Sequence, residues 1–235
     1  MINFKILTLF PQLFPGPLDI SITGEALRNK IWSLQTINIR DYAFDNRGSI
    51  DDTPYGGGAG MLMRADVVGN AIQKNISSQD KTKIIYLSPK GKLFKQETAQ
   101  KLAKESEIVV LCGRYEGVDQ RVIDEFAIEE ISIGDYIISG GEIACYVFID
   151  AIIRNIKGVL GAQQSLQEES FSFAEDCDYF NLLEYPHYTR PASWCNRDVP
   201  EVLLSGNHKN IANWRKEKAI EITKKNRPDL LKNKS

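Results

Sequence analysis

The chain has 235 residues, of which 43% are hydrophobic and 26% charged, with a formal net charge of −2. This length and composition can bury the core of one ordinary domain plus a smaller one. No apolar run approaches the roughly 18 residues of a membrane span. Four scattered cysteines without a C-x-x-C pair predict reduced thiols in a cytosolic protein, and two isolated histidines, His187 and His208, argue against a zinc site.

The first 155 residues alternate apolar, strand-like segments with helical ones. Strands are expected at Phe4–Phe10, Leu34–Ile39, Lys83–Leu87, Ile108–Cys112 and Ile128–Ile133, and helices at Thr23–Lys30, Ala65–Lys74, Gln96–Lys104, Gln120–Phe126 and Glu142–Ile156. This alternation predicts an α/β fold, in which a mainly parallel sheet carries helices on both faces. The N-terminal segment is too short for a signal peptide and is interpreted as the first buried strand.

Two glycine-containing runs, Gly113–Asp119 and Ser132–Gly141, begin where expected strands end. Ligands of parallel sheets bind beyond the carboxyl ends of the strands, so both runs and Ser88-Pro89 are expected to converge on one site. Glycines let the main chain turn and come close to a ligand, and a helix that opens at Gly140-Gly141 offers unpaired N–H donors. Together these features predict a pocket of main-chain groups for a nucleoside cofactor.

A third glycine run, Tyr55–Met61, lacks the Lys-Ser/Thr of a Walker loop, so ATP chemistry is unsupported. Two interpretations stay open for it. It is either a flexible surface loop or a glycine hinge that closes over a substrate.

Lys157–Gly161 interrupts the pattern and a polar, acidic stretch follows it. We therefore expect a domain at 1–157, a flexible linker at 158–180 and a helical domain at 181–235, with its clearest helix at Ile211–Ile222. From Gly206 to Ser235 nine Lys/Arg stand against three Asp/Glu. This basic piece is either a contact for a polyanion or a solvated helix face. Likewise Pro186–Pro191, with its aromatic residues, suits stacking on nucleobases or docking of one domain on another.

These motifs occur together, in the same order, in one known family. They are Leu9-Phe10-Pro11, Arg40-Asp41, Asp51–Gly58, Tyr86–Pro89, Cys112–Gly117, Ser132–Glu142, Gly158–Gly161, Tyr185–Pro191 and Val202–His208. On these residues the chain resembles the bacterial tRNA (guanine-N1)-methyltransferases of the SPOUT superfamily. The resemblance extends over nearly the whole chain.

The resemblance implies a trefoil knot in the C-terminal part of the α/β domain, which is a rare exception among folds. It also implies S-adenosylmethionine as methyl donor, a magnesium requirement without an assigned metal ligand, and a cytoplasmic enzyme that has no contact with membranes. The implied partners are tRNA and a second copy of the chain, with active sites at the interface of the homodimer. The implied reaction methylates N1 of guanosine 37, preferably where guanosine also occupies position 36.

Carried over residue by residue, the resemblance assigns two groups of site residues. Arg154 and Glu169 are the expected catalytic residues, as the cation beside O6 of guanine and as the base that removes the N1 proton. The expected cofactor residues are Tyr86, Leu87, Ser88, Pro89, Gly113, Tyr115, Glu116, Ser132, Ile133, Gly134, Asp135, Tyr136, Ile137, Ile138, Gly140 and Gly141.

Glu169 departs from the family, which has Asp at this position of its Ser-x-x-x-Asp-Ser-Phe segment. Reference pKa values of the two residue types differ by only about 0.4, so the extra methylene of Glu is the greater concern. Either the linker has adjusted, or Glu168 serves as the base, or activity is reduced. Arg154 also has a simpler interpretation, as a cation at the end of a helix. Two alternative functions therefore remain: a SPOUT methyltransferase with another RNA target, and a catalytically impaired homologue that binds tRNA.

Overall fold

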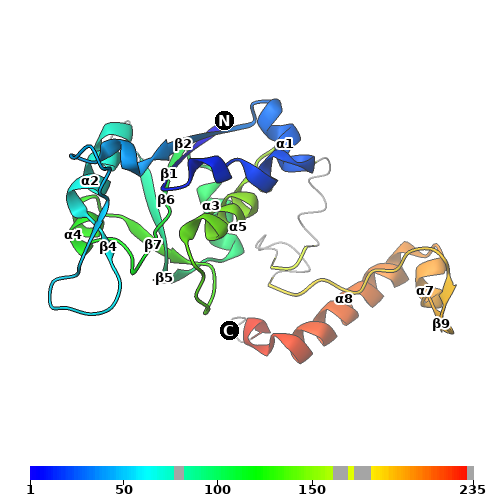
Figure 1. Ribbon diagram of the computed structural model, residues 1–235. Coiled ribbons are helices and arrows are strands. Elements are labelled where there is room, and N and C mark those ends of the chain that lie inside the picture. The colour runs from blue at the N-terminus through cyan, green and yellow to red at the C-terminus, as the bar shows by residue number, and fades with distance from the viewer. Residues whose placement is uncertain (77–81, 161–168, 172–180, 232–235) are drawn as a thin grey trace. The chain divides into compact units, whose positions relative to one another are not determined.

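The computed structural model describes residues 1–76, 82–160, 169–171 and 181–231 (Figure 1). It divides the chain into two compact units, Met1–Gly161 and Ala162–Ser235, which are described separately. Most of the expected linker, 158–180, lies outside the described residues.

The first unit is built on a five-stranded sheet in the order β2-β1-β6-β5-β7. Its strands are β1 (Ile2–Thr8), β2 (Trp32–Asn38), β5 (Lys83–Leu93), β6 (Glu107–Leu111) and β7 (Glu129–Ser132). Every neighbouring pair runs parallel, which confirms the expected sheet. The carboxyl ends of β5, β6 and β7 therefore meet at one edge, where the sequence predicts the site.

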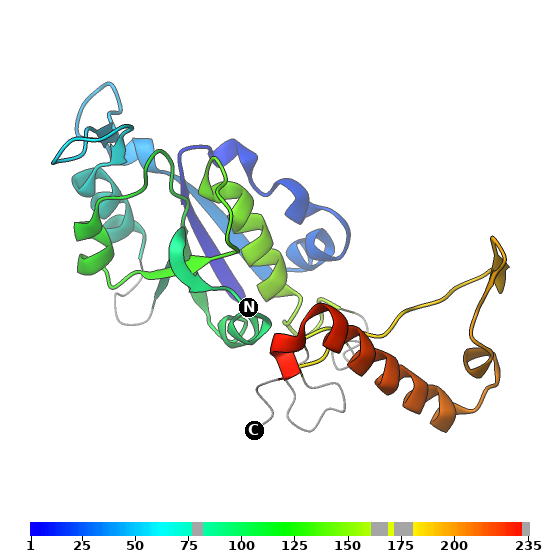
Figure 2. The same cartoon turned by 90° about the horizontal axis from the view of Figure 1, so that it is seen from below.

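Helices cover both faces of the sheet, as predicted (Figure 2). On one side lie α1 (Ser21–Arg28), α3 (Gln96–Leu102) and α5 (Gly141–Ile153), and on the other α2 (Ala65–Asn75) and α4 (Gln120–Glu125). A hydrophobic core lies on each face of the sheet, and strand β6 contributes to both. Ile108 and Val110 belong to the core under α1, α3 and α5, and Val109 and Leu111 to the core under α2 and α4. Because side chains alternate along a strand, a strand buried on both faces is apolar throughout.

Strand β5 is longer than the sequence suggests, because it continues through Pro89. Leu87 and Lys92 both pair with Ile131 of β7, so the intervening residues loop out of the register. Proline has no N–H for a sheet ladder, and such an irregularity is where a strand tolerates it. The β-carbon of any larger residue at Gly91 would lie 2.3 Å from the Ile131 nitrogen, so this crossing is very close.

Smaller elements complete the first unit. They are the 3-10 helices η1 (Pro11–Leu13), η2 (Gly16–Asp19) and η3 (Ile39–Tyr42), and the antiparallel pair β3 (Asp51–Asp52) and β4 (Leu62–Met63). The third glycine run connects β3 to β4 and projects from the unit as a loop (Figure 1). No neighbour lies within 4 Å of the β-carbon positions of Gly56, Gly57 and Gly58.

The second unit contains the hairpin β8 (Ser193–Trp194) and β9 (Arg197–Asp198), then α7 (Glu201–Leu204), α8 (His208–Asn226) and η4 (Pro228–Leu231). The helix expected at Ile211–Ile222 is thus the centre of a longer one, capped by the Asn207 side chain, which accepts from Asn210 N at 3.2 Å. A small core of Leu182, Tyr185 and Ala219 packs residues 181–185 against α8. Among the described residues, no helix combines the length and the hydropathy that crossing a bilayer requires.

Candidate active site

A cavity of about 220 Å³ lies at the carboxyl ends of β5, β6 and β7. Three segments line it, together with Ala144 of α5: 86–89, within β5 where its register with β7 breaks, 113–117 after β6, and 131–141 without Asp135, from the end of β7 onward. The three stretches singled out in the sequence therefore do converge on one pocket.

Of the expected cofactor residues, all but Asp135 line this cavity. Asp135 is exposed, because the Tyr136 N–H donates to the Gly134 carbonyl at 3.0 Å and makes residue 135 the apex of a tight turn. The cavity also includes residues that sequence reasoning missed: Arg114, Gly117, Ile131, Ser139 and Ala144.

The main chains of two lining segments are joined directly. The Gly141 N–H, in the first turn of α5, donates to the Gly113 carbonyl at 2.9 Å. The β-carbon of a larger residue at 141 would lie 2.8 Å from Cys112 Cα and 2.9 Å from Gly113 N. Glycine is therefore required at position 141 by the close approach of two main-chain segments, whereas the sequence predicted a close approach to a ligand.

Tyr86 forms one wall of the pocket. The β-carbon of a larger residue at Gly113 would lie 2.7 Å from its ring and hydroxyl. Burial raises the pKa of Tyr86 to about 12, with a smaller contribution from the charge of Glu130. The phenol is therefore neutral at physiological pH and presents an uncharged, largely apolar surface.

The segment 136–138 of the lining is more open to solvent. Tyr136, Ile137 and Ile138 are 56%, 81% and 38% exposed. The Ser132 hydroxyl donates to the Gly134 carbonyl at 3.1 Å and accepts from the Gly134 N–H at 3.2 Å, which fixes the start of this segment. Exposed apolar side chains around a main-chain pocket suit a flat, partly apolar ligand such as a nucleoside.

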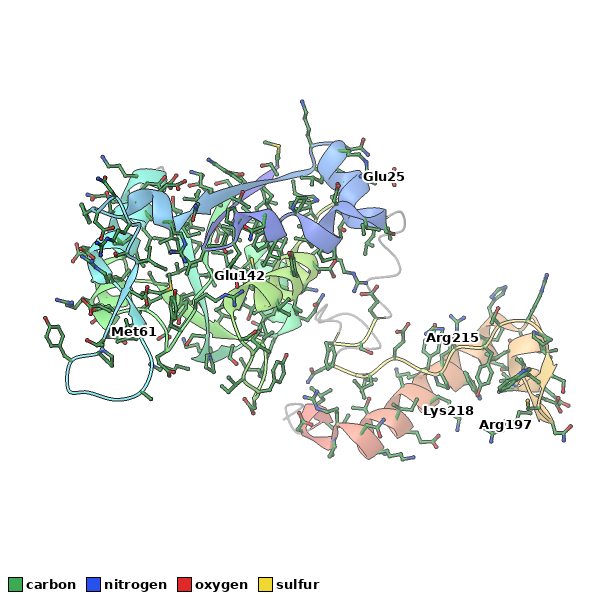
Figure 3. All side chains as sticks on the ribbon, viewed as in Figure 1. Glu25, Met61, Glu142, Arg197, Arg215 and Lys218 are labelled. Atoms are coloured by element: carbon green, nitrogen blue, oxygen red, sulfur yellow. The ribbon has the colours of Figure 1, made fainter. Side chains whose placement is uncertain are left out.

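The β3–β4 loop is attached to the pocket at its base. Met61, at the base of the loop (Figure 3), accepts from the Glu116 N–H at 2.9 Å. Gly60 lies against Glu116, since a β-carbon at residue 60 would be 2.4 Å from Glu116 Cγ. The loop thus ends beside a residue that lines the cavity, a position compatible with the closing role considered for it.

A second, more polar cavity of about 500 Å³ lies around Asp52–Tyr55, Leu62–Asp66, Asp119 and Arg121. Two ion pairs border it: Arg64 with Asp66 at 2.6 Å and Arg121 with Asp119 at 2.8 Å. The hydrogen bond from each arginine lowers the pKa of its aspartate, so both carboxylates are ionised at neutral pH.

The two expected catalytic residues belong to different units. Arg154 is exposed and caps the C-terminus of α5, where its N–H donates to the Asp150 carbonyl at 3.2 Å. Glu169 is half-buried and precedes Ser170 and Phe171, which are hydrogen-bonded to the segment 182–184 of the second unit. Glu168 lies outside the described residues. The catalytic assignment of both residues therefore stays a prediction.

A protein-built metal site is not found in the described parts of the chain, where no three His, Cys, Asp or Glu side chains gather to hold an ion. Among the cysteines in those parts, Cys112, Cys145 and Cys195 are free, and Cys177 lies outside them. His187 pairs with Glu184 at 2.8 Å.

Comparison with known proteins gives consistent matches along the chain. The family model described as tRNA (Guanine-1)-methyltransferase TrmD matches residues 2–233. A Wolbachia pipientis wMel protein named tRNA (guanine-N(1)-)-methyltransferase is 52% identical over 97% of this chain and 95% of its own length. Proteins of the same name from Ehrlichia canis (strain Jake) and Rhodospirillum rubrum are each 50% identical, over 97% and 96% of this chain and 95% and 90% of their own lengths.

Proposed function

This chain belongs to the tRNA (guanine-1)-methyltransferase family, and on that premise we propose that it transfers a methyl group from S-adenosylmethionine to N1 of guanosine 37 in tRNA, with guanosine preferred at position 36. One observation carries the proposal. All but one of the residues that the family resemblance assigns to the cofactor line this pocket, in a chain that the family model matches from residue 2 to 233.

The pocket is suited to the adenosine part of the cofactor. Leu87, Ile133 and Ile138 supply apolar surface, while the glycine-containing turns at 113 and 140–141 bring main-chain donors and acceptors close to the ligand. When bound, S-adenosylmethionine supplies a methyl group on a positively charged sulfur, which makes that carbon electrophilic. Water is kept from one side of the site by the Tyr86 wall, which is buried.

Glu169 and Arg154 would act on the guanine. N1 of guanine carries a proton, and the Glu169 carboxylate takes this proton so that the N1 lone pair can form the new bond to carbon. The C–S bond breaks with its electron pair staying on sulfur, which becomes a neutral thioether. As the proton leaves N1, negative charge moves to O6, and the Arg154 guanidinium stabilises it there. Arg154 and Glu169 come from different units of the chain, and the proposal requires both side chains to reach the same guanine.

The magnesium requirement implied by the resemblance has no counterpart among the described side chains, which form no metal-binding cluster. No step of the proposed methyl transfer is assigned to the ion. The requirement remains an expectation, to be tested by activity with and without a chelator.

We also propose that the loop crossing at Pro89–Lys92 belongs to the trefoil knot of SPOUT proteins. Strand β5 pairs with β7 both before and after the looped-out residues, and beyond them Phe94 N donates to the Ser132 carbonyl at 2.8 Å. A cytoplasmic location is part of the proposal, since it follows from tRNA as the substrate.

Binding of tRNA is assigned to the second unit. Helix α8 carries exposed Lys209, Lys216, Lys224 and Lys225, and a basic surface attracts the phosphate backbone. Tyr188, 48% exposed, and Trp194, 70% exposed, add aromatic surface of the kind on which bases stack.

The homodimer is proposed on the exposed face of α5. This helix is apolar on nearly all sides, and such helices are normally buried all round. Ile143 and Val147, one turn apart, are nevertheless 58% and 50% exposed. A second copy of the chain that covers this face would bring another subunit next to the pocket, since α5 begins at Gly141 of its lining.

Replacing both exposed residues, as Ile143→Lys with Val147→Lys, is expected to weaken the dimer by at least about 100-fold, because two charges would be desolvated in an apolar interface. Sedimentation velocity over a concentration series measures this, and methyl transfer should fall with the dimer fraction. Phe44→Lys is the matched control, since Phe44 is 69% exposed but lies outside α5. A double variant that sediments as the parent chain does would contradict the assignment of this face.

The test of the function is transfer of labelled methyl from S-adenosylmethionine to unmodified tRNA carrying guanosine at 36 and 37, with magnesium present. The expected product is 1-methylguanosine at position 37, identified by mass spectrometry of the digested RNA. A tRNA with adenosine at 37 is the negative control. Absence of transfer from folded, dimeric protein would refute the proposal.

One observation favours a second candidate. Glu169 stands where the family has Asp, so a catalytically impaired, tRNA-binding homologue is the alternative. It predicts tRNA binding at normal affinity without methyl transfer in the same assay. Methylation at another nucleotide would instead indicate a SPOUT methyltransferase with a different RNA target.

A further inference from the structure

Glu142 is a carboxylate in an unusual place. It is fully buried, in the first turn of α5, a helix whose other buried residues are all apolar or small (Figure 3). Buried carboxylates are rare unless they are paired and hydrogen-bonded, because removing the charge from water is costly. The side chain is 1% exposed and is not among the residues that line the cavity.

Two elements supply its partners. The Thr8 hydroxyl, at the end of β1, donates to Glu142 Oε1 at 2.7 Å. Arg114, from the turn after β6, donates through Nε to Glu142 Oε2 at 2.9 Å, and its Nη2 lies 2.8 Å from the same oxygen. Both carboxylate oxygens are therefore satisfied, one by a hydroxyl and one by the fork of a guanidinium.

Arg114 also contacts the segment that precedes α5 in the lining of the pocket. Its Nη1 donates to the Ser139 carbonyl at 3.2 Å, and the guanidinium lies 4.5 Å from the centre of the Phe10 ring. It also rests directly on Gly140, since a β-carbon at that position would be 2.3 Å from Arg114 Nε. One side chain thus touches the 113–117 turn, the 139–140 segment and the start of α5.

From these contacts we propose that Arg114 and Glu142 are positioning residues, which hold the two glycine turns of the pocket in the spacing that the cofactor requires. The inference rests on the proposed function, because it assigns the pocket to S-adenosylmethionine. Arg114 lines the cavity, whereas Glu142 acts only through Arg114 and through the first turn of α5. The contact they maintain is the hydrogen bond from Gly141 N to Gly113 O.

A guanidinium is needed for this task. Its planar fork makes two contacts to Glu142 and one to Ser139 at the same time, which a single ammonium on a lysine cannot reproduce. Arg114→Lys therefore keeps the charge but removes the bridge. Glu142→Gln keeps the size of the side chain but removes its charge, so that Arg114 loses its anchor.

Calorimetric titration with S-adenosylhomocysteine tests the proposal at a temperature where each variant is folded by circular dichroism. We expect Arg114→Lys and Glu142→Gln each to raise Kd by at least about tenfold, since small displacements of positioning groups have effects of this size or larger. Hydrogen exchange of the Gly141 amide should speed up in both, because this N–H reports the joint between the two turns.

The matched control is Lys5→Met. Lys5 pairs with Glu107 at 2.8 Å, with side chains 13% and 16% exposed, at the amino end of β6 and away from the pocket. Loss of this ion pair should lower the stability of the fold without changing Kd for the ligand by more than about twofold, because an ion pair outside the cofactor pocket affects only folding. Thr8→Val and Thr8→Ser form a milder pair: the first removes a hydrogen bond to Glu142 and should weaken binding, and the second keeps the hydroxyl and should bind normally.

The possible results distinguish a positioning role from a structural role and from failure of the proposed function. If both charge variants bind as the parent chain does, with stability losses like that of Lys5→Met, the pair is merely structural and the proposal is wrong. If only Arg114→Lys binds weakly, Arg114 touches the ligand directly and the positioning role of Glu142 is wrong. If neither charge variant folds, the Thr8 pair decides. If the parent chain itself does not bind the ligand, the proposed function fails, and this inference fails with it.

Discussion

Glu169→Gln is expected to lower kcat for methyl transfer by about 10²- to 10⁴-fold, the range typical of losing a general base. The amide cannot accept the N1 proton, yet it has nearly the size of the carboxylate. Glu169 is not among the residues that line the cofactor cavity, so Kd for S-adenosylhomocysteine should stay within about twofold of the parent value. Steady-state methylation of tRNA, with calorimetry for the ligand, measures both quantities.

Glu184→Gln is the control for this experiment. Glu184 is also half-buried in the second unit, and its carboxylate pairs with His187 rather than with the substrate. Glu169→Asp tests the departure from the family, and activity within about tenfold of the parent is expected if the neighbouring chain accommodates either length. Unchanged turnover in Glu169→Gln would be incompatible with this base and would move the role to another carboxylate, such as Glu168.

The double variant Glu169→Gln with Arg154→Ala extends the argument. Base and guanidinium act on the same transition state, the first at N1 and the second at O6. Residues that act as a unit give losses far smaller than the product of the single losses. A loss equal to the product of the two single losses would indicate that the two residues act independently, and unchanged turnover in Arg154→Ala would leave Arg154 only its simpler interpretation, as the residue that ends α5.

The architecture of the first unit follows from the sequence because its signals are local. Runs such as Ile108–Leu111 are apolar on both faces, and this pattern specifies a strand covered on two sides. The alternation of strands and helices then requires parallel pairing with helices on both faces. The extent of β5 was not predictable in the same way. Ser88-Pro89 reads as the end of a strand, and only pairing with β7 carries the strand onward to Leu93.

The pocket was predictable at its glycines and unpredictable at Arg114. Glycines after a strand indicate a turn or a close approach of the main chain without reference to other residues. The role of Arg114, in contrast, depends on its contact with Glu142, 28 positions later in the chain. A signal did exist in the sequence. Glu142 opens a helix that is otherwise almost entirely apolar, and a carboxylate among such residues demands a buried cationic partner. Nothing local to either residue identifies the other, because the pairing is set by the tertiary fold.

Gly141→Ala is the prediction that bears most directly on the pocket. The added methyl would lie 2.8 Å from Cys112 Cα and 3.1 Å from the Cys112 carbonyl carbon. These are main-chain atoms and cannot swing aside, so the turn after β6 and the start of α5 must separate. Separation lengthens the bond between Gly141 N and Gly113 O, now 2.9 Å, and widens the cofactor pocket.

A displacement of about 1 Å in positioning groups can cost on the order of 100-fold, so Gly141→Ala should raise Kd for S-adenosylhomocysteine by at least that factor. Overpacking should also destabilise the fold by about 1–3 kcal/mol, a range that leaves an ordinary domain folded at 25 °C. Calorimetry gives Kd, and thermal unfolding with and without ligand gives an independent measure of binding.

Gly69→Ala supplies the matched control, because it makes the same chemical change at an ordinary contact. Gly69 lies in α2, on the other face of the sheet, and a β-carbon there would meet Phe126 at 3.6 Å. Alanine favours a helix over glycine by about 1 kcal/mol, so this variant should be at least as stable as the parent and bind the ligand equally well. If Gly141→Ala also bound with unchanged affinity, the close approach of residues 112–113 to 141 would have no part in holding the nucleoside. Variants of the larger, polar cavity beside Arg64 and Arg121 would then test whether the ligand binds there instead.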